Sequence, residues 1–338
     1  MIGRLLLVLS IAGSSALAAP TITSVTPNSG PIAGGTRVII KGSGFSKNCL
    51  FCLPQLPAPS VNFGSLSATE VKFIDSTMVE AVTPQSFPLT VSVSVTNLDG
   101  TGSAEAPNAF TFVGDINEEF EPLLLPIFTR PVFGAFGSEF RTFARVMAIN
   151  NPNIRLYGVD RRCLQVFQPL DPAVPVVVTE DIALSPDCAF GTGRILWTHK
   201  GDGALLAMNL RVADVSREAT SHGTEIPVIR ANEFSTEGFV ALLGIPTDPR
   251  FRITLRIYSL DRTDQPVRIL GILGLQSFIR DVQLSTPADV FDPAFTVVSD
   301  LPPATRLIVA SPAPGTRIWA FITVTNNVTQ QITTITPQ

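Results

Sequence analysis

Histidine is almost absent from this chain, and this limits the catalytic mechanisms open to it. The 338 residues include only His199 and His222. A serine hydrolase needs a histidine beside a nucleophile and a carboxylate. Neither histidine lies in such a signature, and no Gly-x-Ser-x-Gly elbow occurs. Both lie in stretches typical of turns, so we expect exposed loop residues and assign no catalytic residue.

Charged side chains are also scarce, at 15% of the residues against 45% hydrophobic ones. This balance excludes a disordered tail and is sufficient for substantial buried cores. The net charge is -4, and bulk attraction to nucleic acid is therefore excluded. Phosphate-binding glycine loops and clusters of metal ligands are missing from the sequence, so we expect no cofactor and no metal.

Long hydrophobic runs are missing after the N-terminus, so we expect no integral membrane segment. The first residues are predicted to be a signal peptide, residues 1–18. Arg4 supplies a positive charge, residues 5–12 form an apolar run, and Ala16-Leu17-Ala18 fits a cleavage site. We therefore expect a mature chain that is secreted or otherwise extracytoplasmic, in the periplasm or at the cell surface.

Cysteine occurs four times, and an oxidising compartment favours structural disulfides. We expect Cys163 to pair with Cys188, and Cys49 to pair with Cys52. A zinc site would need a second closely spaced pair. Thioredoxin-like redox chemistry would need a βαβ context around Cys49 and Cys52, which the sequence does not show.

Short strand patterns separated by turn residues fill the first third of the mature chain. Val38 and Ile40 alternate with Arg37, Ile39 and Lys41, which is typical of a strand with one buried face. A hairpin turn is predicted at Asp99-Gly100. Further strand-like runs cover residues 61–63, 70–74, 78–82, 89–96 and 109–113. About seven short strands with turns between them predict a β-sandwich.

Motifs at both ends of this region resemble those of the IPT/TIG domain, an immunoglobulin-like module. The residues that carry the resemblance are Ile22, Val25, Pro27, Gly30, Gly34, Gly35, Thr36, Val38, Ile40, Gly42, Gly44, Phe45, Val95, Asn97, Asp99, Gly100, Ala109, Phe110 and Phe112. The loop at residues 46–60, which carries the first cysteine pair, departs from the family by its length. Over residues 20–113 the resemblance implies a sandwich used as a spacer or interaction module, with no catalytic residues. Plexin-type receptors, some transcription factors and many bacterial surface proteins share this module, and a leader before it is typical of a bacterial protein.

An acidic segment follows the predicted domain at residues 20–114. Residues 115–122 are predicted to be a linker, because the glycine and spaced ligands of a calcium loop are missing. Beyond it, residues 140–146 resemble residues 251–257, at an offset of 111 positions. We therefore expect two tandem, duplicated β-sandwich domains, residues 123–229 and 230–338, in an all-β protein. Residues 234–243 are a candidate for a short helix.

Four side chains in this second part are candidate ligand contacts. Arg252 and Arg256 share one strand face and could bind an anionic glycan or a partner's carboxylates. The alternative is a solvated face whose arginines pair with nearby Asp and Glu. Trp197 and Trp319 could stack on a sugar, but their surroundings also fit core packing.

These observations predict an exported, non-catalytic protein for adhesion, scaffolding or recognition, with the IPT/TIG module as a spacer or interaction domain. Its partner would be a protein or a glycan at the cell surface. A carbohydrate-binding accessory protein is the first alternative. A hydrolase with an unidentified site in residues 123–338 is the second.

Overall fold

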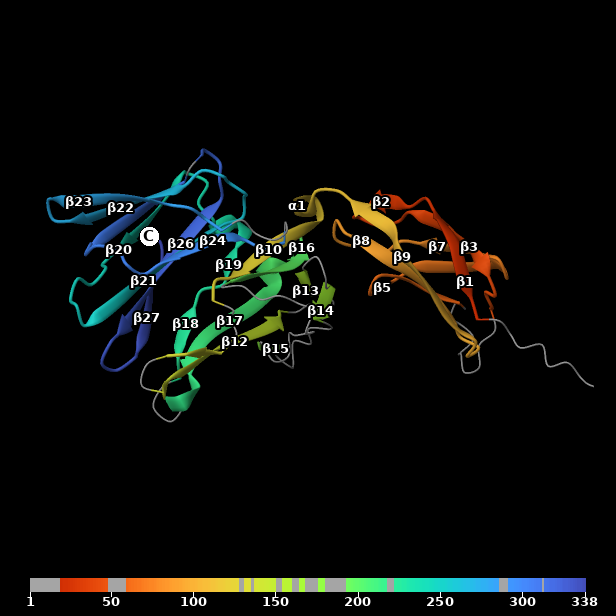
Figure 1. The fold of residues 1–338 in the computed structure, drawn as a ribbon, viewed down its shortest axis with the longest axis horizontal. Helices are drawn as coiled ribbons and strands as arrows, with labels where there is room; N and C mark the ends of the chain where they lie inside the picture. Colours follow the sequence, from red (N-terminus) through yellow and green to blue (C-terminus); the bar gives the residue numbers. More distant parts are fainter. Residues whose placement is uncertain are drawn as a thin grey trace, which may run out of the picture. The chain divides into compact units, whose positions relative to one another are not determined.

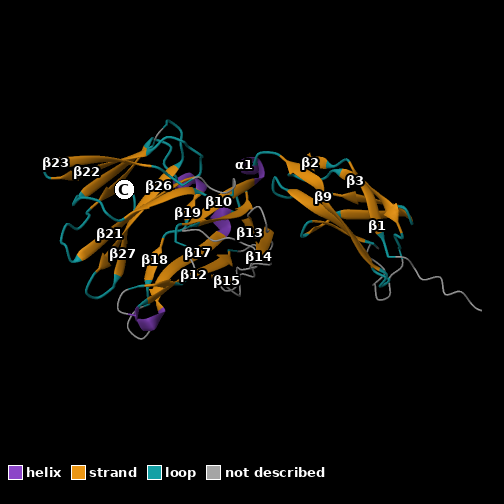
Figure 2. Ribbon diagram, viewed as in Figure 1, coloured by secondary structure: helices purple, strands orange, loops and turns teal. Residues whose placement is uncertain are grey.

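A computed structural model describes most of the chain, and nearly all of the regular secondary structure in the described residues is β-strand (Figures 1 and 2). The chain divides into two compact units, Met1–Glu119 and Phe120–Gln338. Among the described residues, no helix has the length and apolar character needed to cross a membrane. The described residues are 19–47, 59–127, 131–134, 137–149, 154–159, 164–167, 176–179, 193–217, 222–285, 291–311 and 313–338. The predicted signal peptide and all four cysteines lie outside them.

The first unit is a β-sandwich, as predicted. One sheet has the order β1 (Thr21–Thr26), β3 (Arg37–Ser43), β7 (Met78–Val82), β6 (Glu70–Asp75). The other has the order β2 (Ser29–Pro31), β9 (Gly102–Val113), β8 (Thr90–Asn97), β4 (Ser60–Phe63), β5 (Leu66–Ser67). Neighbouring strands are antiparallel except β2 and β9, which are parallel. A single-turn helix, α1 (Ile116–Glu119), follows.

The core of this sandwich lies between the two sheets. Val38 and Ile40 on β3 are fully buried, whereas Arg37 and Lys41 are exposed, as the alternation predicts. Opposite them, the rings of Phe110 and Phe112 pack edge to face with centroids 5.0 Å apart. The apolar side chains of both sheets therefore form one continuous cluster.

The described strands of the second unit form four sheets. In its N-terminal half, one sheet has the order β14 (Leu164–Phe167), β13 (Leu156–Val159), β16 (Arg194–His199), β10 (Phe120–Leu125), β19 (Ile229–Arg230). The other has the order β11 (Val132–Phe133), β12 (Glu139–Ala148), β17 (Leu206–Asp214), β18 (Thr224–Ile226), and β15 (Val176–Thr179) also pairs with β12. Short 3-10 helices are η2 (Gly203–Leu205), η3 (Val215–Arg217) and η4 (Ala231–Glu233).

The C-terminal half of this unit is a second sandwich. Its sheets have the orders β20 (Phe239–Leu243), β25 (Arg306–Ala310), β22 (Val267–Leu273), β23 (Gln276–Val282) and β24 (Ala294–Val298), β21 (Phe251–Ser259), β26 (Ile318–Asn326), β27 (Ile332–Ile335). Leu255, Ile257 and Ile322 from one sheet pack with Val267 and Leu307 from the other in a buried cluster.

The two halves have the same strand order. The series β14–β13–β16–β10 corresponds to β23–β22–β25–β20, and β15–β12–β17–β18 corresponds to β24–β21–β26–β27. An internal duplication would produce this shared order. Strand β10 begins at Phe120, within the segment predicted as a linker, and it also pairs with β19.

Two local predictions are wrong. The predicted helix at residues 234–243 contains strand β20 instead, because pairing with β25 buries Val240 and Leu242 on one face. An apolar run of this length fits either structure until its neighbours are known. His199 is the last residue of β16 rather than part of an exposed turn, and it stacks on Phe120 with ring centroids 5.1 Å apart.

Candidate ligand pocket in the C-terminal unit

One face of the sheet that contains β21 and β26 carries the predicted arginine row. The antiparallel register places Arg252 opposite Thr325, Thr254 opposite Thr323 and Arg256 opposite Phe321. Directly opposite residues share a face. The next pair on the same face is Tyr258 and Trp319. The face therefore changes from aromatic at one end to polar at the other.

The aromatic end of this face is buried against the N-terminal half of the unit. Tyr258 is 0% exposed, and its hydroxyl donates to the carbonyl of Pro126. A Cβ added at Gly193 would lie 2.8 Å from the Tyr258 ring. The ring centroid of Trp319 is 6.3 Å from that of Tyr258 and 5.1 Å from that of Phe321.

This packing decides the role of the two tryptophans. Trp319 is 4% exposed and Trp197, on β16, is 3% exposed. A sugar can stack only on an accessible ring face, so neither indole can contact a glycan in this structure. Their burial agrees with the core-packing alternative.

The polar end of the face borders a pocket of about 360 Å³ between the two halves of the unit. The C-terminal half contributes Arg252, Thr254, Arg256, Thr323, Thr325, Gln330 and Ile332. The N-terminal half contributes Ile127, Val132, Phe133, Gly134, Phe140, Thr142, Val212 and Ile226. The lining residues in the described part of the chain include two arginines and no acidic side chain.

Arg256 is the cation inside this pocket. Its Nη1 donates to Thr323 Oγ1 at 2.7 Å, and its guanidinium carbon lies 5.8 Å from the ring centroid of Phe321. Its Nε is buried and has no hydrogen-bond partner among the described residues. Burial lowers the pKa of Arg256, because the charged form loses water.

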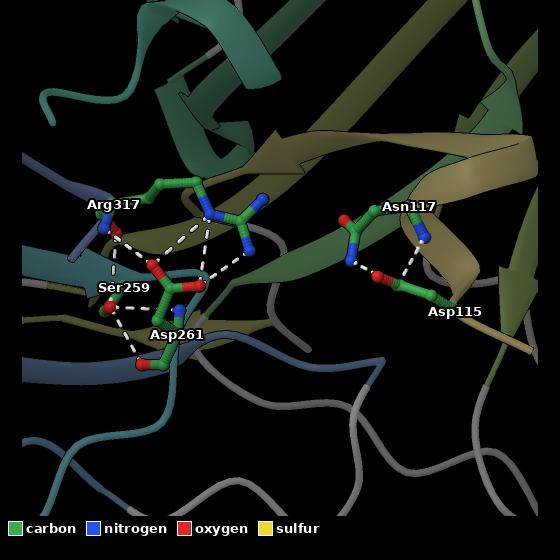
Figure 3. Close-up of polar contacts among 5 residues, drawn as sticks. All are labelled: Asp115, Asn117, Ser259, Asp261 and Arg317. Carbon is green, nitrogen blue, oxygen red and sulfur yellow. Dashed lines mark hydrogen bonds and ion pairs between the residues drawn. The ribbon is translucent and has the colours of Figure 1, made fainter. Parts of the chain in front are cut away.

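Other arginines of the same unit have carboxylate partners. Arg317 binds Asp261 with Nη2 2.6 Å from Oδ1 (Figure 3), and Arg268 binds Asp281 with Nε 2.8 Å from Oδ1. In the described part of the chain, Arg256 and Arg252 have no such ion pair. The local pairing that the sequence offered as an alternative for these two residues is therefore not found among the described residues.

Arg252 differs from Arg256 in its surroundings. It is exposed, and it lines a second pocket of about 260 Å³ as well as the larger one. The two arginines of the predicted row thus provide one half-buried and one exposed cation at the same pocket.

The contributions of the N-terminal half were missed by sequence reasoning. Thr142 and Ile226 have no motif that marks them, and they reach the pocket only because the two halves pack together. His199 lies outside the pocket lining and contacts Tyr157, with its Nε2 3.0 Å from the Tyr157 hydroxyl. No group of three or more His, Cys, Asp or Glu side chains in the described ranges could hold a metal ion.

Comparison with known sequences identifies the first unit. Residues 20–112 match the sequence model of the IPT/TIG domain, and the resemblance expected from the motifs is confirmed. The chain is therefore a multidomain all-β protein with an N-terminal IPT/TIG domain. No match was found among the curated proteins.

Three solved structures show low similarity to this chain. The extracellular region of plexin A4, domains 1 to 10, has a TM-score of 0.24 and 14% identity, over 90% of this chain and 22% of that chain. A second plexin A4 structure has a TM-score of 0.24 and 17% identity, and the match covers 66% of this chain and 19% of that chain. A putative phosphatase from Bacteroides thetaiotaomicron has a TM-score of 0.23 and 10% identity, over 96% and 98%. The chain thus spans about a fifth of the plexin structures, and these likenesses carry no argument about function.

Proposed function

We propose that this chain is an exported, non-catalytic recognition protein. The IPT/TIG domain is its spacer or interaction module, and the C-terminal unit binds an anionic group of a cell-surface partner in the Arg256 pocket. The observation that carries this proposal is the half-buried guanidinium of Arg256, which has no carboxylate partner among the described residues.

A buried cation without a counterion is expensive to keep. Desolvation of a charge costs several kcal/mol unless an opposite charge and further hydrogen bonds compensate it. A methionine or leucine would fill the same space without that cost. An anionic ligand would supply the missing charge, so the cost is incurred only in the unbound state.

The pocket also has the properties of a preformed binding site. Its volume of about 360 Å³ lies within the range of roughly 300–1,000 Å³ that is common for ligand sites. Apolar side chains such as Phe140 and Ile226 form part of its wall, and threonine hydroxyls and arginines provide the polar contacts. This combination favours binding of a partner over a purely architectural role.

A binding screen tests the proposal. The mature protein, from residue 19, is applied to panels of cell-surface glycans and proteins, and hydrolysis products are measured in the same samples. We expect binding without turnover. We also expect Arg256→Met to weaken that binding and Arg268→Met, which removes a charge from an exposed ion pair, to leave it unchanged. Hydrolysis of a bound partner, or binding that both variants retain, would contradict the proposal.

A further inference from the structure

We infer that the Arg256 pocket takes a uronate, a single sugar ring that bears a carboxylate, either free or as one unit of an acidic polysaccharide. This inference rests on the proposed function, because it specifies the ligand of the same site. It follows from the charge, the hydroxyl groups and the size of the pocket.

The charge of the pocket fits a carboxylate. Arg256 Nη1 already donates to Thr323 Oγ1, and Nε is buried, which leaves Nη2 as the guanidinium nitrogen for a ligand. A carboxylate oxygen can accept a charge-assisted hydrogen bond from Nη2. It would also neutralise the guanidinium.

A single half-buried arginine also argues against a phosphate or sulfate as the preferred anion. Phosphate groups are commonly bound by helix N-termini and glycine-rich loops, and a dianion is better neutralised by more than one nearby cation. The described wall of this pocket comes from strands and their connections, and the second arginine, Arg252, is exposed. A ligand with one negative charge matches the single positive charge of Arg256 inside the pocket.

The rest of the wall fits a hydroxylated ring. Four threonines, Thr142, Thr254, Thr323 and Thr325, line the pocket, and each hydroxyl can both donate and accept a hydrogen bond. Phe140 and Ile332 provide apolar surface for the C–H groups of a ring. A short aliphatic acid would leave these hydroxyls without ligand partners, whereas a sugar acid offers several.

Calorimetric titration of the mature protein tests the inference directly. The ligands are glucuronate and galacturonate, their neutral counterparts glucose and galactose, acetate as the carboxylate alone, and polygalacturonate as the polymeric source. We expect binding of at least one uronate, and no binding of the neutral sugars or acetate at the same concentrations. Tighter binding of the polymer than of the monomer would identify a polysaccharide unit, and equal binding per ring would identify the free sugar acid.

Three variants are compared with the unchanged protein in this titration. Arg256→Met is expected to weaken uronate binding by about 10- to 100-fold, because charged hydrogen bonds are lost. Thr254→Val, which keeps the shape of the side chain, is expected to weaken it less. Arg268→Met, on an exposed ion pair of the same unit, is the matched control and should bind as the unchanged protein does.

Several results would overturn the inference. Absence of binding for every uronate, free or polymeric, is one, and equal binding of acetate and uronate is another. Uronate binding that Arg256→Met retains places the ligand elsewhere and also overturns it. If the uronates fail while another anionic partner binds in an Arg256-dependent way, the proposed recognition function stands and only its ligand class is wrong.

Discussion

Arg317 and Asp261 are joined by both the side chain and the backbone of the arginine. The Arg317 Nη2 lies 2.6 Å from Asp261 Oδ1, and the Arg317 backbone N–H donates to Asp261 Oδ2 at 2.6 Å (Figure 3). The hydroxyl of Ser259 donates to the Asp261 carbonyl at 2.8 Å. Asp261 therefore connects the end of β21 to the residue before β26.

Replacement of this carboxylate should destabilise the C-terminal unit. Asp261→Asn keeps the shape of the side chain but removes its charge, and we expect a loss of about 1–2 kcal/mol in the free energy of unfolding. Urea denaturation followed by fluorescence measures it. Asp281→Asn, which disrupts the more exposed pair with Arg268, should cost about 0.5 kcal/mol or less. Equal losses in the two variants would show that the backbone contact adds nothing.

Replacement of Arg256, unlike that of Asp261, should not destabilise the protein. Since the Arg256 guanidinium is half-buried without an ion pair among the described residues, Arg256→Met should leave the unliganded protein as stable as before, or raise its free energy of unfolding by about 1 kcal/mol. Differential scanning calorimetry without added anion measures this change. A loss above about 2 kcal/mol, the size expected when a satisfied charged contact is removed, would mean that the protein itself compensates the charge.

The Tyr258 hydroxyl should contribute to stability through its bond to Pro126. Tyr258→Phe keeps the ring but removes the donor to a buried carbonyl, and we expect a loss of about 1–3 kcal/mol in the free energy of unfolding. Equilibrium denaturation in urea measures it. Ser311→Ala removes a hydroxyl that donates on the surface and should change stability by about 0.5 kcal/mol at most. A similarly small change for Tyr258→Phe would refute this role.

Two glycines of the IPT/TIG domain should respond differently to alanine. A Cβ at Gly42 would lie 1.8 Å from the carbonyl oxygen of Thr21 on the paired strand, so β1 and β3 could not keep their spacing. Gly35 has a φ of +80° and open space around it, so alanine there meets only backbone strain. We expect Gly35→Ala to cost about 1–2 kcal/mol and Gly42→Ala about 3 kcal/mol or more. Thermal unfolding compares them, and the reverse order would contradict the close approach of the strands.

Asp214 should make the stability of the C-terminal unit sensitive to acid. Burial raises the pKa of Asp214, but hydrogen bonds from the Ser216 hydroxyl and from the Glu139 backbone outweigh this effect, so the pKa lies below its usual value. A carboxyl with a lowered pKa in the folded state stabilises the protein above the unfolded-state pKa, near 3.9. That contribution is lost as the pH falls through the lower, folded-state value.

Urea denaturation between about pH 2 and pH 7 tests this dependence. Asp214→Asn should lower stability at neutral pH and reduce the fall below about pH 4. Glu225, an exposed carboxyl on β18, supplies the control variant Glu225→Gln, which should keep the acid dependence of the unchanged protein. Identical acid dependence in all three proteins would contradict a stabilising role for the Asp214 carboxylate.

Much of the fold could be predicted because strand alternation is a local property. The alternation on residues 251–257 predicts that Arg252 and Arg256 share one strand face, and both line the same pocket, while Leu255 and Ile257 on the other face lie in the core. The glycines and aromatic residues of the first domain likewise identify its family, since close strand approach and ring packing require those residue types. Strand β20 was mispredicted because its short apolar run is equally compatible with a helix, and only pairing with β25 decides it.

The candidate site was only partly predictable. Two of its residues, Arg252 and Arg256, could be selected from the sequence, but the two tryptophans selected with them are buried. The contributions of Thr142 and Ile226 could not be predicted, because they depend on the packing of segments that are distant in sequence.

The sequence by itself determined the β-class, the IPT/TIG domain and which side chains share a strand face, because these depend on period-two alternation and on local turn chemistry. The tertiary structure alone decided what covers each face. It buried Tyr258 against Pro126 and Trp319 beside Tyr258, and it opened a pocket at the other end of the same face. It also left Arg256 there with no carboxylate partner in the described part of the chain. The electrostatic cost of that arrangement depends on groups that only folding brings together.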